Sequence, residues 1–402
     1  MIPLPLSRPV PTYGRHLAIC ESQSAARSPP IFHLIFALPA ILVITQFLWP
    51  MALPLLAKIL VAALMLAASQ FQFWSKLSSG SVFAPEFPRS VVILFNWASG
   101  SILFLALMQL LLSAGYLGVW MASGNAPAVP ETLRYAMAGA SGLLGAIGVL
   151  NAVRVPPLKD VDLLIRDLPS QYEGYTILQL TDLHISRLFP ASWTGKVVDR
   201  ANALAVDLVV VTGDVIDGSL AMRRADVAPL ARLEAKDGIY MSPGNHEYFL
   251  GFREWMQHFS EMGMRILGNA HAILERGGAR LMLAGVTDRS APATGQPRPD
   301  LAAALAGGPD GVPIILLDHQ PGGAHRAAAR GIAAQLSGHT HGGMMPGLAW
   351  LVARGNAGFV SGLYDVDGMT LYVNNGTGIW PGFALRLRRP CELTRLTLRR
   401  AP

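Results

Sequence analysis

The chain has 402 residues, of which 51% are hydrophobic and only 14% are charged. A typical soluble domain carries about 25% charged residues, so neither a disordered chain nor an ordinary cytosolic enzyme of uniform composition fits. The deficit is confined to residues 1–153, which hold seven basic and three acidic side chains, whereas residues 154–402 hold 25 and 23. The composition therefore predicts a membrane part followed by a globular part. No run of Lys and Arg accompanies the net charge of +6, so no nucleic-acid partner is expected.

The first part contains four apolar stretches, at residues 31–49, 51–74, 91–123 and 135–153. Because about 20 apolar residues span a bilayer as a helix, we predict four transmembrane helices with the lipid bilayer as their partner. Pro50 between the first two stretches predicts a tight hairpin, because proline disfavours helix at the residue before it. The predicted domains are an N-terminal cytoplasmic segment at 1–30, a four-helix transmembrane region at 31–153 and a globular domain at 154–402.

The loop charges predict the orientation in the membrane. An even number of spans places the N-terminus and the globular domain on the same side. The loops of that side carry seven basic residues: Arg8, Arg15, Arg27, Lys76, Arg89, Arg154 and Lys159. The opposite loops hold only Arg134. By the positive-inside rule we expect a multi-pass protein of the inner (cytoplasmic) membrane, with its globular domain in the cytoplasm.

The globular part alternates short apolar runs with helical patterns. Strands are predicted at residues 175–181, 207–212, 239–242, 281–286, 312–317, 333–337, 369–373 and 393–398. A helix is predicted at 192–205, because its apolar residues recur on one face. This alternation is typical of an α/β layered domain, in which reactive groups gather at the carboxyl ends of the strands.

Polar side chains follow five of these predicted strands, at the point where each strand ends. They are Asp182 and His184, Asp214 and Asp217, Asn245 and His246, His319, and His339 and His341. Carboxylates and imidazoles without thiolates are ligands for Mn²⁺, Fe and Zn²⁺. Residues two apart on an extended segment point the same way, so Asp182 and His184 can hold one ion. One carboxylate, Asp214, can bridge two ions about 3.5–4 Å apart, and such a pair clamps both oxygens of a displacement at phosphorus.

In chain order the clusters read DxH from Asp182, GDxxD from Gly213, GNHE from Gly244, the lone His319, and GHTHGG from Gly338. Together they resemble the motifs of the calcineurin-like metallophosphoesterases, over residues 161–398. With the apolar stretches in front, the chain is similar to the membrane-bound branch of that family, the transmembrane proteins with a metallophosphoesterase domain. The resemblance implies an αββα sandwich of two mixed sheets over the globular part, preceded by an all-α membrane domain of four transmembrane helices.

The resemblance also implies the chemistry. It indicates a dinuclear metal-dependent phosphohydrolase, a phosphodiesterase or phosphatase, whose nucleophile is a hydroxide bridging the two metals. We therefore expect two divalent metal ions as cofactors, with Mn²⁺ favoured and Fe or Zn²⁺ as alternatives. No phosphoenzyme is implied.

Carried over position by position, the resemblance assigns two overlapping ligand sets. The first metal would be held by Asp182, His184, Asp214 and His341, and the second by Asp214, Asn245, His319 and His339. His246 would not bind metal but would face the leaving-group oxygen as general acid, and Asp217 would orient it and keep it protonated. For Glu247, a direct role and a supporting position at a helix start stay open.

Two features depart from the family pattern. Phosphoprotein phosphatases carry an arginine that grips the phosphate where this chain has Gly218, so a protein phosphatase of that branch is not expected and phosphate recognition stays unassigned. After GHTHGG comes the apolar run 344–352, which is either a loop packed onto the core or an apolar lip beside the metals. Residues 249–252 could form the wall facing such a lip.

The leading hypothesis for function is a membrane-anchored phosphohydrolase acting on a lipid-linked or amphiphilic phosphoester, as in phospholipid metabolism. One alternative is a tethered hydrolase of soluble nucleotides, which a lip buried in the core would favour. Another is a non-catalytic membrane sensor or scaffold. The full ligand set weighs against the last, because a scaffold does not need so many polar side chains in one place.

Overall fold

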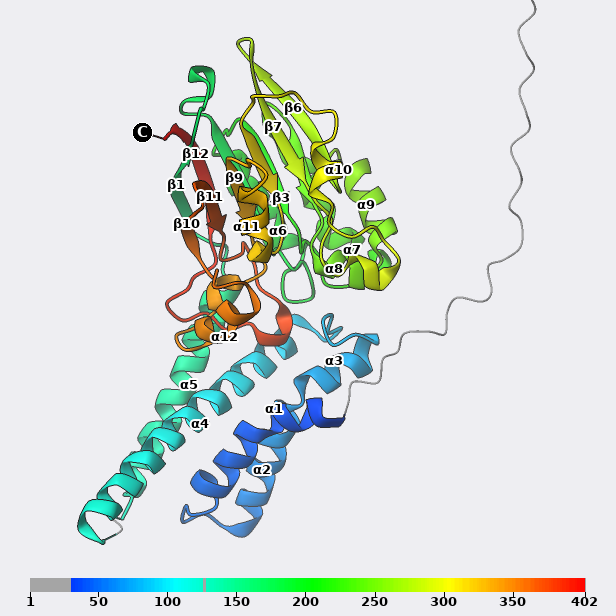
Figure 1. Cartoon of the computed structure of the whole chain (residues 1–402). Coiled ribbons are helices and arrows are strands. Elements are labelled where there is room, and N and C mark those ends of the chain that lie inside the picture. The colour runs from blue at the N-terminus through cyan, green and yellow to red at the C-terminus, as the bar shows by residue number, and fades with distance from the viewer. Residues whose placement is uncertain (1–29, 126–127, 402) are drawn as a thin grey trace, which may run out of the picture.

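The computed structural model describes residues 30–125 and 128–401, with side chains from residue 35 (Figure 1). A bundle of long helices comes first, and a domain of two sheets is seated on one end of it. The predicted N-terminal segment lies outside the described residues apart from Pro30. Its basic residues Arg8, Arg15 and Arg27 therefore have no structural account.

The helical region consists of two neighbouring hairpins. In the first, α1 (Pro30–Val43) continues into a π-helical turn (Ile44–Leu48) and is followed by α2 (Leu55–Ser69) and α3 (Phe71–Ser79). In the second, α4 (Arg89–Ser123) runs antiparallel to α5 (Glu131–Val153). Pro54, Pro88 and Pro130 immediately precede α2, α4 and α5, where proline's fixed φ suits the entry to a helix.

Two helices, α4 and α5, are long and apolar enough to cross a membrane, and α2 with α3 is a third candidate if this bent pair is one span. The described part of the first apolar stretch, Ile35–Leu48, is a shorter apolar helix. The structure thus supports two or three candidate spans rather than the predicted four.

The stretch at 51–74 is interrupted near its end, because its last residues begin α3, which leaves the axis of α2. Gln70 ends α2 outside helical geometry, and α3 turns away from α2 by 58°. The side chain of Gln72 then donates from Nε2 to the carbonyl oxygen of Gly382 in the sheet domain, at 3.3 Å. Hydropathy alone counts these residues as membrane, whereas their polar side chains bind the domain.

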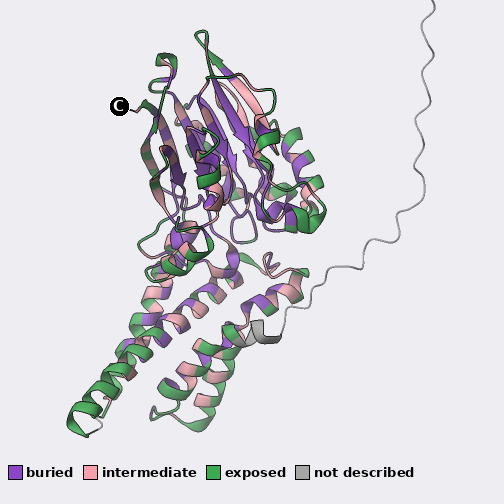
Figure 2. Cartoon of the chain, in the orientation of Figure 1, coloured by how far each residue is buried: buried purple, intermediate pink, exposed green. Residues whose placement is uncertain are grey.

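The outer surface of the helical region is apolar. Leu64, Leu111 and Leu150 are 71%, 75% and 65% exposed. Figure 2 shows exposed residues along the outward faces of α2, α4 and α5, whereas the interior strands of the sheets are mostly buried. An apolar surface of this extent is unfavourable in water and matches the lipid-facing surface of a helical bundle.

Twelve strands form two mixed six-stranded sheets. The first has the order β1 (Leu158–Ile165), β12 (Leu393–Arg400), β2 (Thr176–Leu180), β3 (Leu208–Thr212), β4 (Ile239–Ser242) and β5 (Arg265–Ile266). The second has the order β10 (Gly362–Val366), β11 (Met369–Val373), β9 (Ala334–Ser337), β8 (Ile314–Leu317), β7 (Ala279–Gly285) and β6 (Ala270–Arg276). In each sheet a run of parallel strands is combined with antiparallel pairs.

All eight predicted strands are present, and they are the interior strands of the two sheets. The four strands that the sequence did not indicate, β1, β5, β6 and β10, are the four sheet edges. Edge strands carry polar residues and are only partly covered, so they lack a buried apolar run. In β6, for example, the sequence AHAILER contains a single buried residue.

The two sheets pack face to face between outer helices. Ile177 of β2 and Val210 of β3 point into the cluster between the sheets, whereas their neighbours Leu178 and Val211 point outward. The outward side of the first sheet packs on α6 (Ala191–Asn202), α7 (Leu220–Val227) and α9 (Phe252–Glu261). The second sheet is covered by α10 (Leu301–Leu305) and α11 (Ala324–Ala328). These layers agree with the expected αββα sandwich.

The helical region and the sheet domain share one core. Phe71, Val92 and Ala152 belong to the same buried cluster as the outer face of the first sheet. A Cβ at Gly100 of α4 would lie 2.8 Å from the methyl groups of Leu385, so a larger residue here would require the Leu385 side chain to shift. The long α4 therefore uses its first turns to hold the domain, which explains why its apolar stretch exceeds one span.

The side chain of Asn96 is the polar centre of this junction. It is 2% exposed, donates to the carbonyl of Pro381 at 2.8 Å and accepts from the amide of Ala384 at 2.6 Å. Its Nδ2 atom also donates to the carbonyl of Val92, one turn earlier in α4, at 2.9 Å. The buried amide is thus paired on both its nitrogen and its oxygen, and it fixes the segment 381–384 onto α4.

We expect Asn96→Ala to destabilise the junction by about 1–3 kcal/mol for each backbone group left unsatisfied. The measurement is the thermal unfolding midpoint in detergent together with limited proteolysis between α5 and β1. Asn125→Ala, at an exposed position beyond α4, is the matched control and should leave the midpoint unchanged. An equal midpoint for both variants would contradict the role of Asn96.

Candidate metal centre

The predicted site residues all follow strands of the two sheets and meet at one end of the sandwich. Asp182 and His184 follow β2, Asp214 and Asp217 follow β3, Asn245 and His246 begin α8 (Asn245–Phe249) after β4, His319 follows β8, and His339 and His341 follow β9. Three groups of His and Asp each have ligand atoms within 4.8 Å of one another, and two of these groups share His184.

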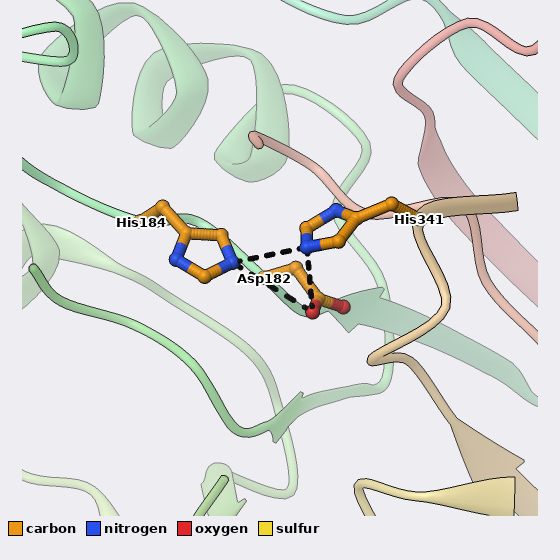
Figure 3. Close-up of side chains that lie close together, drawn as sticks. All are labelled: Asp182, His184 and His341. Carbon is orange, nitrogen blue, oxygen red and sulfur yellow. Dashed lines mark hydrogen bonds and ion pairs between the residues drawn. The ribbon is translucent and has the colours of Figure 1, made fainter. Parts of the chain in front are cut away.

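The first group is Asp182, His184 and His341 (Figure 3). The Nε2 atoms of the two imidazoles are 3.2 Å apart. They lie 3.9 Å and 3.6 Å from Oδ1 of Asp182. All three donor atoms thus converge on one point, as the first predicted ligand set requires.

The second group is Asp214, His319 and His339. Nε2 of His319 lies 3.2 Å from Oδ2 of Asp214 and 3.2 Å from Oδ1 of Asn245. The second predicted ligand set is therefore also gathered in one place, with the amide oxygen of Asn245 at its edge.

Asp214 connects the two groups. Its Oδ2 atom is 3.9 Å from Nε2 of His184 in the first group and 3.2 Å from Nε2 of His319 in the second. Its side chain is 3% exposed. One carboxylate within reach of both groups is the arrangement that a bridging ligand needs.

The hydrogen bonds of the imidazoles leave the correct nitrogens free for metal. Nδ1 of His319 lies 2.8 Å from the carbonyl of Thr212, which can only accept, so the proton is on Nδ1. Nε2 of His319 then faces two acceptor oxygens. Burial lowers the pKa of this imidazole, but Asp214 outweighs it and raises the pKa well above its usual range, so a positive charge is favoured between Nε2 and these oxygens. A divalent ion would take the place of the Nε2 proton there, and the donor set fits such an ion.

The same reasoning applies to the first group. Nδ1 of His184 lies 3.1 Å from Oδ2 of Asp217, so its Nε2 lone pair points at His341. Burial, and then the nearby His184 and Arg386, hold the pKa of His341 well below its usual range. His341 is therefore a neutral ligand rather than a cation.

The backbone at the site is held in an unusual conformation. Five of the twelve non-glycine residues with positive φ in the described part of the chain are predicted ligands. They are Asp182, His184, Asp214, His339 and His341, with φ between 46° and 69°. Each such conformation costs about 1–3 kcal/mol and persists where the surrounding structure enforces it. Strain concentrated on these residues marks the loops as functional.

His246 and Asp217 form a third group together with His184. Nδ1 of His246 makes a short hydrogen bond to Oδ1 of Asp217, and its Nε2 lies 3.9 Å from Oδ2 of Asp214. Burial lowers the pKa of this imidazole, but the carboxylates of Asp214 and Asp217 outweigh it and raise the pKa to about 9. The imidazole of His246 is therefore protonated on both nitrogens at neutral pH, and it lies near the two groups of candidate metal ligands.

Glu247 supports the loops and does not reach into the site. Its carboxylate accepts from the backbone amides of Asp214, Val215 and Gly244 at 3.0, 2.7 and 2.7 Å. Of the two possibilities left by the sequence, the supporting position at the start of α8 is the one observed.

Arg386 is a buried residue of the site that the motifs did not indicate. Its guanidinium donates to the carbonyls of His341, Asn375 and Gly378. Its backbone amide donates to the carbonyl of Gly148 in α5, at 2.9 Å. Arg386 thus joins α5, a candidate membrane span, to a candidate metal ligand. No motif carries this signal, because the partners are distant backbone carbonyls.

The apolar run 344–352 is divided between core and surface. Met345 is 4% exposed and belongs to the core, whereas Trp350 and Leu351 of α12 (Leu348–Gly355) are 58% and 55% exposed. Arg354 lies over the Trp350 ring at 3.5 Å. The idea of one continuous lip is therefore wrong for Met345. By itself, the burial of Met345 favours the alternative of a tethered hydrolase of soluble nucleotides.

The predicted facing wall is present in part. The ring of Phe249 is 45% exposed, and its centroid is 5.9 Å from that of His246. A further ring, Phe83 from the helical region, lies 5.1 Å from His246 and was not expected from the sequence. It is distant in the chain from every motif, so no local pattern could have identified it.

Residues 175–343 match the family model described as calcineurin-like phosphoesterase. Two similar curated proteins are named "Transmembrane protein with metallophosphoesterase domain". The one from Danio rerio is 34% identical over 64% of this chain and 61% of its own length. The one from Bos taurus is 32% identical over 74% of this chain and 71% of its own length. Among solved structures, a dimetal phosphatase from Danio rerio is similar, with 12% identity and a TM-score of 0.31 over 51% of this chain and 88% of that one.

The bridging position of Asp214 leads to a direct prediction. Asp214→Ala should remove bound metal from both groups, because each loses a ligand and the charge that balances its ion. The fold should survive, since the core of the sandwich is apolar. Elemental analysis of purified protein should find about two ions per chain in the wild type and almost none in the variant. Asp199→Ala, an exposed carboxylate on α6, should keep both. Two ions in Asp214→Ala would refute the bridging role.

Proposed function

The chain belongs to the calcineurin-like metallophosphoesterases, which are metal-dependent hydrolases of phosphoric esters, and we propose that it is a membrane-anchored dinuclear phosphohydrolase acting on an amphiphilic phosphoester. The observation that carries this proposal is the pair of His and Asp groups joined by Asp214 at the end of the domain that faces the helical bundle.

Seven side chains would hold the two metals. They are Asp182, His184, Asp214, Asn245, His319, His339 and His341, divided as the sequence motifs indicated. When bound, two divalent ions neutralise phosphoryl oxygens and supply a hydroxide from water near neutral pH. Carboxylate, amide and imidazole donors favour Mn²⁺, with Fe and Zn²⁺ as the alternatives.

His246 would act as general acid. Asp217 holds its Nδ1, which directs Nε2 toward the space beside Asp214. A protonated imidazole at this position can donate to the oxygen of the departing alcohol as the bond to phosphorus breaks. Asp217 is thereby a positioning residue, because it acts through His184 and His246 and does not need to touch the substrate.

The anchoring proposal uses the whole helical region. We infer four crossings: α1 with its π-helical turn, the bent α2 and α3, α4 and α5. Lys76, Arg89 and Arg154 lie at the end of the bundle that carries the sheet domain, and Arg134 lies toward the opposite end. The positive-inside rule then favours a cytoplasmic catalytic domain at the inner membrane.

The role of His246 can be tested with leaving groups of different basicity. His246→Ala should keep both metals and lose about 10²–10⁴ in kcat for an alkyl ester, the usual effect of a positioned proton donor. The loss should be much smaller for a nitrophenyl ester, whose leaving group needs little protonation. Steady-state kinetics with metal analysis measures both, and His325→Ala, an exposed histidine, is the control. An equal loss across leaving groups would assign His246 another function.

The proposed orientation predicts the behaviour of reporter fusions. A fluorescent protein fused after Pro402 should fluoresce, and alkaline phosphatase fused at the same point should be inactive, because the C-terminus follows the sheet domain into the cytoplasm. The same pair fused after Gly124, between α4 and α5, should behave in the opposite way. Alkaline phosphatase activity at the C-terminus would place the catalytic domain outside.

A further inference from the structure

The loop at residues 80–88, between α3 and α4, is fastened to the sheet domain beside the site. Its Glu86 accepts from Nε of Arg187 at 2.7 Å and from the buried guanidinium of Arg223. Arg223 in turn donates from Nε to the carbonyl of Asp217, at 3.1 Å. Just beyond the loop, Nε of Arg89 donates to the carbonyl of Leu188 at 2.9 Å. The segment between α3 and α4 is thus held against the loops that follow β2 and β3, and the second of these carries Asp217, the partner of the candidate acid.

The ring of Phe83 in this loop lies directly on the candidate acid. Its centroid is 5.1 Å from that of His246 in an edge-on arrangement. It also stacks on Phe249 at 5.4 Å and contacts Trp380 at 5.7 Å. Phe249 keeps 45% of its surface exposed. Phe83 and Phe249 therefore lie against the imidazole, and Trp380 packs behind Phe83 with its buried Nε1–H unpaired among the described residues. The exposed part of Phe249 leaves the group open to its surroundings.

The geometry points to a binding site for the apolar part of the leaving group. We propose that Phe83, Phe249 and Trp380 form this subsite and that the substrate is a phosphoester of a long-chain alcohol. The inference rests on the proposed function, in which His246 donates to the leaving-group oxygen. Whatever lies against that imidazole borders the leaving group. On the side away from Asp214 and Asp217, its ring neighbours include Phe83 and Phe249.

The chemistry of the loop favours an apolar occupant over a nucleoside. Phe83 and Phe249 offer no hydrogen-bond donor or acceptor to a ribose. The neighbouring charged groups, Glu86, Arg187 and Arg223, are already paired with one another. The loop also connects directly to α4, whose exposed leucines would lie in lipid, so a long-chain alcohol can reach the rings from the bilayer.

The experiment varies only the length of the alcohol. Full-length protein in nanodiscs with Mn²⁺ is assayed on monoalkyl and symmetric dialkyl phosphates from methyl to octyl, whose leaving groups have nearly the same basicity. In the wild type, kcat/KM should rise with chain length through KM, by about fourfold for each methylene that becomes buried. The dependence of kcat/KM on chain length thus measures the burial of the alkyl chain, separately from the ease of breaking the bond to phosphorus.

Three variants assign this dependence to the loop. Phe83→Ala should lower the octyl-to-methyl ratio of kcat/KM by about tenfold, and Phe83→Leu should retain most of it, because an apolar side chain remains. Phe87→Ala is the matched control. It removes a ring from the same loop, but that ring packs on Phe95 at 6.1 Å, so the ratio should stay as in the wild type.

Binding measured without turnover separates this inference from the proposed function. Octylphosphonate and methylphosphonate carry a carbon–phosphorus bond that is not hydrolysed, and calorimetry should show tighter binding of the octyl compound that depends on Phe83. Hydrolysis without a chain-length preference, or a preference unchanged in Phe83→Ala, would overturn the subsite and leave the phosphohydrolase standing. Preferential octylphosphonate binding with no ester hydrolysed would support the subsite and refute the proposed function.

Discussion

The carboxylate of Asp217 is the interaction on which the site depends. One oxygen lies 3.1 Å from Nδ1 of His184 and the other makes a short hydrogen bond to Nδ1 of His246. Burial raises the pKa of this carboxyl, but the two imidazoles outweigh it and lower the pKa, so the group stays charged. A single buried anion thereby leaves a lone pair on His184 for metal and a proton on His246. The backbone carbonyl of Asp217 accepts a hydrogen bond from Arg223, which also pairs with Glu86. The anion is thereby linked to the loop at residues 80–88.

The interior of the sandwich could be predicted from the sequence, because burial on both faces produces continuous apolar runs such as the one at Leu208–Thr212. The motifs also indicated which side chains gather at the strand ends. The second contact of Asp217, the guanidinium of Arg386 and the ring of Phe83 could not be predicted. Each depends on two segments distant in sequence, and the partners are backbone carbonyls or aromatic faces that have no spacing rule.

The helical region shows a different limit of prediction from the sequence. Hydropathy measures how apolar a stretch is, but it does not tell lipid from protein as the apolar neighbour. The first turns of α4 and the start of α3 pack on the domain through the apolar side chains of Val92 and Phe71. Small residues serve the same purpose: Gly100 and Gly148 accommodate Leu385 where the helices and the domain meet. The sequence of the junction therefore predicts a membrane span, whereas in the structure the junction is part of the protein core.

The shared core has a practical consequence for work on this enzyme class. A recombinant fragment that starts after α5 would be designed to avoid the apolar helices. Its interior would, however, lack the side chains of Phe71, Val92 and Ala152. It would also leave Arg386 without the carbonyl of Gly148. Substrate or inhibitor screens on such a fragment would sample a rearranged cleft, and inactivity there would say nothing about the intact protein.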